Sequence, residues 1–132
     1  MFATGTFEVK LTPQAADERA DAATIGRLAI DKRFAGDLDA VSVGQMLASR
    51  SDVDGSAGYV ALERVTGSLG GRSGSFVLQH SGHADRGRQS LAINVVADSG
   101  TGDLMGLSGT MKIIIEAGAH RYVFDYELTA DN

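Results

Sequence analysis

The sequence predicts an all-β protein, an eight-stranded antiparallel up-and-down β-barrel with little or no helix. Apolar and polar residues alternate with a period of two in about eight segments, which is typical of half-buried strands. Seventeen glycines against one proline indicate many turns, and the 43% of hydrophobic residues supply a core. An open sheet of eight strands would leave two unpaired edges, which closure into a barrel removes. We expect one domain over residues 1–132.

The first four strands follow from this alternation and from the turns between them. Pro13 is expected to end the first strand, and the polar, alanine-rich segment Gln14–Ala23 is either a short helical turn or a loop. Gly36 and the loop 51–55 separate the next strands. The predicted strands are Thr6–Leu11, Ile25–Phe34, Leu38–Leu47 and Gly58–Leu69.

The second half begins with the clearest hairpin signal in the chain, Gly70-Gly71. Polar or glycine-containing loops at 83–87, 98–103 and 117–118 then separate the remaining segments. The predicted strands are Ser73–Gly82, Gln89–Ala97, Leu104–Glu116 and His120–Thr129.

Composition and charge exclude several classes of function. The net charge is −5 and the basic residues are scattered, whereas nucleic-acid binding needs a clustered cationic surface. With no cysteine there is no disulfide or thiolate metal site, which fits a reducing compartment, and we expect a cytoplasmic protein. No apolar run approaches about 18 residues and no signal peptide is evident, so no membrane association is expected.

Three ionisable residues stand on otherwise apolar strand faces: Lys32, Glu63 and His80. If these faces line the barrel, the three groups share a low-dielectric cavity in which their protonation is perturbed, as acid–base sites require. Glu63 and His80 are then the catalytic candidates. Alternatively, the three groups form a structural salt bridge with no functional role, lie at strand ends, or face outward because the inner and outer faces are assigned the wrong way round.

The first functional hypothesis is a barrel that binds a small apolar or amphipathic molecule in its interior. The second is an isomerase or cyclase in which Glu63 or His80 moves a proton and Tyr122 or Tyr126 stabilises developing charge. The residues expected to contact a ligand are Lys32, Phe34, Tyr59, Glu63, Phe76, His80, Tyr122 and Tyr126.

A third hypothesis is a structural module that self-associates, with a dimer as the expected state. Apolar residues occupy both faces of two strands, such as Val60 and Leu62 in one and Ile113, Ile114 and Ile115 in the other. Burial on one side only would leave one set exposed, and association would cover it.

No metal and no cofactor are expected. His80 and His83 form a His-x-x-His pair, but positions i and i+3 of a strand point to opposite faces. The glycine-rich segment 67–74 lacks the Gly-Lys-Ser/Thr ending of a phosphate-binding loop and lies between two strands.

Five motifs, in order along the chain, resemble the bacterial domain-of-unknown-function family 3224. They are Ala29–Phe34, Gly55–Glu63, Gly74–Gly82, Asp98–Gly102 and Leu107–Thr110. The resemblance implies a fold similar to the allene oxide cyclase barrel, with eight antiparallel strands around a cavity. It implies no established activity, and no cyclase motif aligns with a residue of this chain, so no catalytic residue is inherited.

Overall fold

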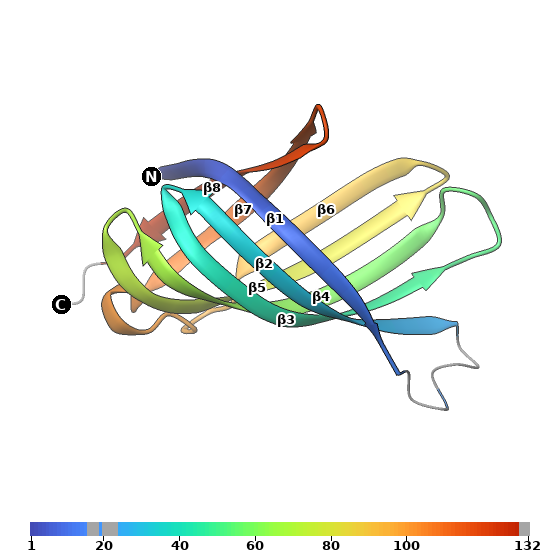
Figure 1. The fold of residues 1–132 in the computed structure, drawn as a ribbon, viewed down its shortest axis with the longest axis horizontal. Coiled ribbons are helices and arrows are strands. Elements are labelled where there is room, and N and C mark those ends of the chain that lie inside the picture. Colours follow the sequence, from blue (N-terminus) through green and yellow to red (C-terminus); the bar gives the residue numbers. More distant parts are fainter. Residues whose placement is uncertain (16–18, 20–23, 130–132) are drawn as a thin grey trace.

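The computed structural model, which describes residues 1–15, 19 and 24–129, is a closed barrel of eight antiparallel strands (Figure 1). Each strand pairs with the next, and β8 returns to pair with β1, so the predicted fold class is confirmed. The strands are β1 (Phe2–Gln14), β2 (Ile25–Gly36), β3 (Leu38–Arg50), β4 (Ala57–Leu69), β5 (Arg72–Asp85), β6 (Arg88–Val95), β7 (Leu107–Glu116) and β8 (Ala119–Leu128).

Several strands extend further than the sequence predicted. The expectation that Pro13 ends the first strand is wrong, because β1 continues to Gln14. Beyond Phe7, β1 is bordered by β2 alone, and the missing N–H of a proline is tolerated at such an edge. Of the expected helix or loop at 14–23, the structure describes Gln14, which belongs to the strand, with Ala15 and Arg19, and the rest lies outside the described residues.

Two loops also differ from the prediction. β5 runs on to Asp85, so the expected loop 83–87 shrinks to a two-residue turn in which Arg86 and Gly87 both have positive φ. β7 begins at Leu107, because Leu104 instead closes the short 3-10 helix η1 (Gly102–Leu104) and is buried. No helix in the described part of the chain is long and apolar enough to span a bilayer.

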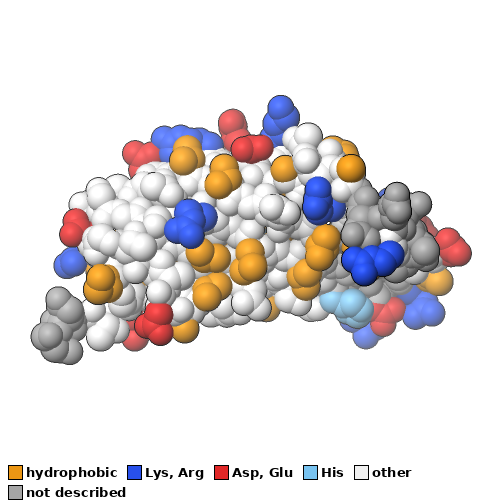
Figure 2. Space-filling model, turned by 90° about the horizontal axis from the view of Figure 1, so that it is seen from below, with side chains coloured by type: hydrophobic (Ala, Val, Ile, Leu, Met, Phe, Trp, Pro, Cys, Tyr) orange, Lys and Arg blue, Asp and Glu red, His pale blue; other side chains and the backbone are white. Residues whose placement is uncertain are grey.

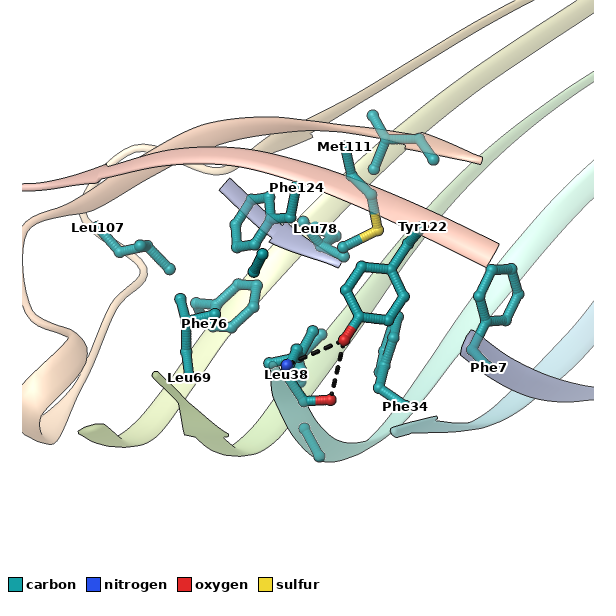
Figure 3. Packing of buried hydrophobic residues seen from close by; sticks show 14 of the residues in the cluster. Phe7, Phe34, Leu38, Leu69, Phe76, Leu78, Leu107, Met111, Tyr122 and Phe124 are labelled. Atoms are coloured by element: carbon teal, nitrogen blue, oxygen red, sulfur yellow. Dashed lines mark hydrogen bonds between the residues drawn. The ribbon is translucent and has the colours of Figure 1, made fainter. Parts of the chain in front are cut away.

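One end of the barrel is filled by hydrophobic side chains, which Figure 3 shows packed together. Phe124 stacks on Phe76, and Tyr122 meets Phe34 edge to face. The Tyr122 hydroxyl accepts a hydrogen bond from the Leu38 N–H at 2.9 Å. It lies 3.0 and 3.2 Å from the carbonyl oxygens of Ala35 and Leu38, to one of which it donates. This end is therefore a closed core.

The β3–β4 and β5–β6 connections lie at the other end of the barrel (Figure 1). Four apolar residues there point inward by strand alternation and yet remain exposed. They are Val9 (37%), Leu11 (44%), Leu91 (45%) and Ile115 (66%). The interior at this end, which we call the mouth, thus presents apolar surface that no described side chain covers.

The wall of the barrel is weakly paired between β6 and β7. Among the described residues these strands share one register pair, Asn94 with Thr110, whereas β4 and β5 pair along thirteen positions from Ala57 to Leu69. Figure 1 shows β6 and β7 diverging from this point toward the mouth. We call this weakly paired junction the seam.

Candidate functional site

The three ionisable residues singled out in the sequence meet inside the barrel, midway between the core and the mouth. Lys32 comes from β2, Glu63 from β4 and His80 from β5, and all three are buried. Each stands at an inward position of its strand, since strand alternation places it with buried neighbours such as Ile30, Val65 or Leu78. The reversed assignment of faces is therefore wrong for these strands.

Glu63 is the centre of this cluster. Its Oε2 atom accepts hydrogen bonds from Lys32 Nζ at 2.8 Å and from His80 Nε2 at 2.5 Å, and its Oε1 atom accepts one from the Ser42 hydroxyl at 2.7 Å. Burial by itself raises the pKa of Glu63. The hydrogen bond from His80 and the positive charge of Lys32 outweigh that effect and hold the pKa at about 2. Glu63 is consequently a fixed anion and a poor proton acceptor near neutral pH.

Lys32 is enclosed as well as paired. Its ammonium lies 5.0 Å from the centre of the Phe7 ring and 5.4 Å from that of Phe34, within the range of cation–π attraction. The charge of Lys32 is thus balanced by Glu63 and covered by two aromatic faces.

The hydrogen bond to Glu63 fixes how His80 presents its second ring nitrogen. In the neutral imidazole Nε2–H donates to Glu63, so Nδ1 is an acceptor. The Tyr59 hydroxyl lies 3.3 Å from Nδ1 and can donate to it. Burial and the charge of Glu63 raise the pKa of Tyr59, which keeps this hydroxyl protonated.

Gly82 makes room for Tyr59. The two residues are cross-strand partners, and a Cβ atom at Gly82 would lie 2.2 Å from Tyr59 Cε1. The tyrosine ring can therefore lie flat over the glycine and reach toward His80. This explains the glycine in His80-Ser81-Gly82 by packing.

The mouth holds a pocket of about 620 Å³. Tyr59 is part of its lining, so this residue links the pocket to His80. The apolar lining includes Met46, Ala48, Ala84 and Leu91, and an exposed cation, Arg50, stands at its rim. The volume lies within the range of about 300–1,000 Å³ that is common for small-molecule sites.

A larger hollow of about 1070 Å³ lies on the outer face of β3, β4 and β5. Its apolar lining side chains, such as Val43, Leu47, Val60 and Leu62, are exposed and alternate with the inward residues. Figure 2 shows the underside of the barrel, where hydrophobic side chains gather along the middle with isolated charged groups between them. This hollow belongs to the surface and is separate from the mouth pocket.

The structure brings four of the eight expected ligand-contact residues together: Lys32, Tyr59, Glu63 and His80. Phe34 covers Lys32, while Phe76, Tyr122 and Tyr126 belong to the packed core or lie against it. The hydroxyl of Tyr122 is already engaged by the backbone.

Ser42 is the member of the cluster that sequence reasoning missed. It shares the inward face of its strand with Leu38 and Ala40, and this alternation is the signal that would have identified it. His80 and His83 point to opposite faces, with His80 buried and His83 exposed, and so do not converge on one site.

Comparison with known proteins gives a family and a close structural match. The family model "Protein of unknown function (DUF3224)" matches residues 3–126. A crystal structure of a protein of unknown function from the DUF3224 family of Shewanella oneidensis MR-1 is 48% identical, with a TM-score of 0.93, and the match covers 99% of this chain and 98% of that one. No curated protein matches. The chain therefore belongs to the DUF3224 family, whose function is unknown.

Proposed function

We propose that the protein binds a small amphipathic molecule in the open half of the barrel. The observation that carries this proposal is the set of inward-facing apolar side chains left exposed at the mouth, among them Leu11, Leu91 and Ile115. Covering such surface stabilises a complex by roughly 25 cal/mol per Å² of apolar area. A bound apolar chain would supply the cover that the described residues do not.

The polar end of the ligand would face Tyr59 and His80. Tyr59 is the member of the polar cluster that lines the mouth pocket, and its hydroxyl lies 3.3 Å from His80 Nδ1. This separation is long for an O–H to nitrogen hydrogen bond, so a ligand atom can replace it without losing a strong bond. The absence of cysteine supports a cytoplasmic location for this binding.

Native mass spectrometry of the purified protein, with analysis of any molecule released on denaturation, would identify a resident ligand. The location of the site is tested by binding of prodan, an uncharged amphipathic fluorophore, followed by its fluorescence. Ala84→Trp places an indole in the mouth pocket, and we expect this variant to bind prodan at least tenfold more weakly than the wild type. Ala92→Trp, on the exposed outer face of β6, is the matched control and should bind as the wild type does. Equal binding by both variants would rule out the mouth as the site.

A second candidate is an acid–base enzyme of isomerase type, favoured by the Tyr59–His80–Glu63 chain of hydrogen bonds. His80 Nδ1 would take a proton from a carbon next to a carbonyl, while Tyr59 donates a hydrogen bond to the carbonyl oxygen. The proton would then return to a different carbon. Glu63 would position His80, because a carboxyl with a pKa of about 2 is a weak base. The test is deuterium uptake from D₂O at the α-carbons of octan-2-one, which His80→Gln should abolish.

We also propose that the outer hollow is covered by a second copy of the chain. Val43 lies between Asp31 and Arg64 in the strand register, and neither charge forms an ion pair with a described residue. A two-fold axis through this apolar patch would bring each Arg64 to the partner's Asp31, so the surface is complementary to itself.

This dimer predicts a specific response to a charge in the patch. Wild-type protein should elute as a dimer in size-exclusion chromatography with light scattering, and Leu62→Glu should convert it to a monomer. Val53→Glu, at an equally apolar exposed site in the β3–β4 loop, should remain dimeric. A wild-type monomer throughout a concentration series would contradict the proposed interface.

A further inference from the structure

We infer that the mouth site selects an uncharged polar head group, a carbonyl or a hydroxyl, and discriminates against carboxylates and ammonium ions. This inference rests on the proposed binding function and names the class of ligand. It follows from counting the hydrogen-bonding atoms and the charges of the buried cluster.

Glu63 is buried and most of its acceptor positions are occupied, which closes it to a cationic ligand. Its two oxygens already accept three hydrogen bonds, from Lys32, His80 and Ser42. Its negative charge is opposed by the ammonium of Lys32 at 2.8 Å. A ligand ammonium would have to reach this buried carboxylate past its present donors, and it would add an uncompensated positive charge to the site.

Lys32 is equally unavailable to an anionic ligand. Its charge is matched by Glu63, and the rings of Phe7 and Phe34 lie over its ammonium. The charges of Lys32 and Glu63 therefore cancel each other. A carboxylate brought against this pair would lose its hydration without gaining an opposite charge, which costs several kcal/mol even after relaxation.

The atoms that remain for a ligand are His80 Nδ1, an acceptor in the neutral imidazole, and the Tyr59 hydroxyl, a donor and acceptor, 3.3 Å apart. A ligand hydroxyl can donate to Nδ1 and accept from Tyr59, and a ligand carbonyl can accept from Tyr59. A carboxylate has no proton to offer Nδ1. Burial and, after it, the negative charge of Glu63 raise the pKa of Tyr59, and the same charge would oppose a second anion at this position.

Arg50 at the rim of the mouth is the competing anchor for an anion. A fatty acid could place its carboxylate beside this exposed guanidinium and its chain in the pocket, with no head group at Tyr59. Arg50 therefore predicts a preference for anionic head groups, and the buried cluster predicts a preference for uncharged ones. One series of ligands distinguishes the two.

The experiment compares four ligands with the same chain and different heads: octan-2-one, octan-1-ol, octanoate and octylammonium. Binding to the wild-type protein is measured by isothermal titration calorimetry at neutral pH. We expect the ketone and the alcohol to bind at least tenfold more tightly than the two ions. If octanoate binds as well as the ketone, the inference is wrong while the binding function stands. If none of the four binds, the proposed function itself fails.

A charge variant tests the cause of the selectivity. Glu63→Gln leaves the ammonium of Lys32 uncompensated, so octanoate should gain at least tenfold in affinity relative to octan-2-one. Glu116→Gln, an exposed glutamate beside Arg121, is the matched control and should leave the ratio unchanged. If Glu63→Gln folds and its affinity for octanoate relative to octan-2-one is unchanged, the argument from charge balance is wrong. If the variant does not fold, the wild-type series still tests the selectivity. If the wild type prefers octanoate and Arg50→Gln no longer binds it, the head group lies at the rim and the inference is wrong.

Discussion

Replacing Lys32 with methionine should lower the free energy of unfolding by roughly 3–5 kcal/mol, the cost typical of leaving one member of a buried ion pair uncompensated. Methionine keeps much of the side-chain volume beside Phe7 and Phe34 but removes the cation from Glu63. Urea denaturation followed by circular dichroism measures the change. Lys112→Met, at an exposed outward position of β7, is the matched control and should change stability by less than about 0.5 kcal/mol.

The double variant Lys32→Met, Glu63→Leu shows how much of the lost stability comes from the unpaired charge of Glu63 and how much from lost packing. With both charges gone, no buried ion remains unpaired, and apolar replacements of buried ion pairs are often neutral or stabilising. We expect the double variant to be more stable than Lys32→Met alone, although Ser42 and His80 lose their acceptor. A double variant no more stable than the single one would show that packing, and not the uncompensated carboxylate, dominates the cost.

Acidification should destabilise the barrel in a window set by Glu63. Its pKa is lowered from 4.5 to about 2 in the folded protein, so the unfolded chain binds a proton first as the pH falls. The stability contributed by the carboxylate is complete above about pH 4.5 and is lost between there and about pH 2. A shift of this size corresponds to about 3 kcal/mol.

The measurement is the free energy of unfolding of the wild type and of Glu63→Gln as a function of pH. The wild-type curve should fall more steeply than that of the variant below pH 4.5, because only the wild type loses this carboxylate. Glu8→Gln, at an exposed position of β1, should follow the wild type. Parallel curves for the wild type and Glu63→Gln would contradict the lowered pKa.

Much of the barrel could be predicted from the sequence because its determinants are local. Alternation in segments such as Tyr59–Val65 fixes both the strand and its inward face, and Gly70-Gly71 fixes a hairpin. The ends of the strands are harder to predict from the sequence, because they depend on partners that are distant along the chain. Pro13 stays in β1 because its neighbour on one side is absent, and Leu104 leaves β7 because η1 buries it.

The cluster was only partly predictable for the same reason. Lys32, Glu63 and His80 stand out as charged residues on apolar faces, and strand alternation alone makes them face inward. Their meeting depends on the register, which sets Lys32 opposite Ser42 and Ala61 opposite His80. The position of the Tyr59 ring depends on Gly82 as its cross-strand partner. The hydrogen bonds that the Tyr122 hydroxyl forms with the backbone depend on the turn after β2. No local pattern carries this information.

The single register pair at the seam gives the barrel an uneven resistance to opening. Elsewhere adjacent strands are joined along runs of pairs, so separating them breaks many hydrogen bonds together. Between β6 and β7, fewer pairs resist separation, and the packing of Ile93 with Leu107 and Met111 in the core supplies the rest. We therefore expect the barrel wall to open first at this junction, with the packed core at the other end as the fixed part. For a ligand bound as proposed above, the rate of this opening would then set how fast molecules too long or too branched for the mouth enter and leave.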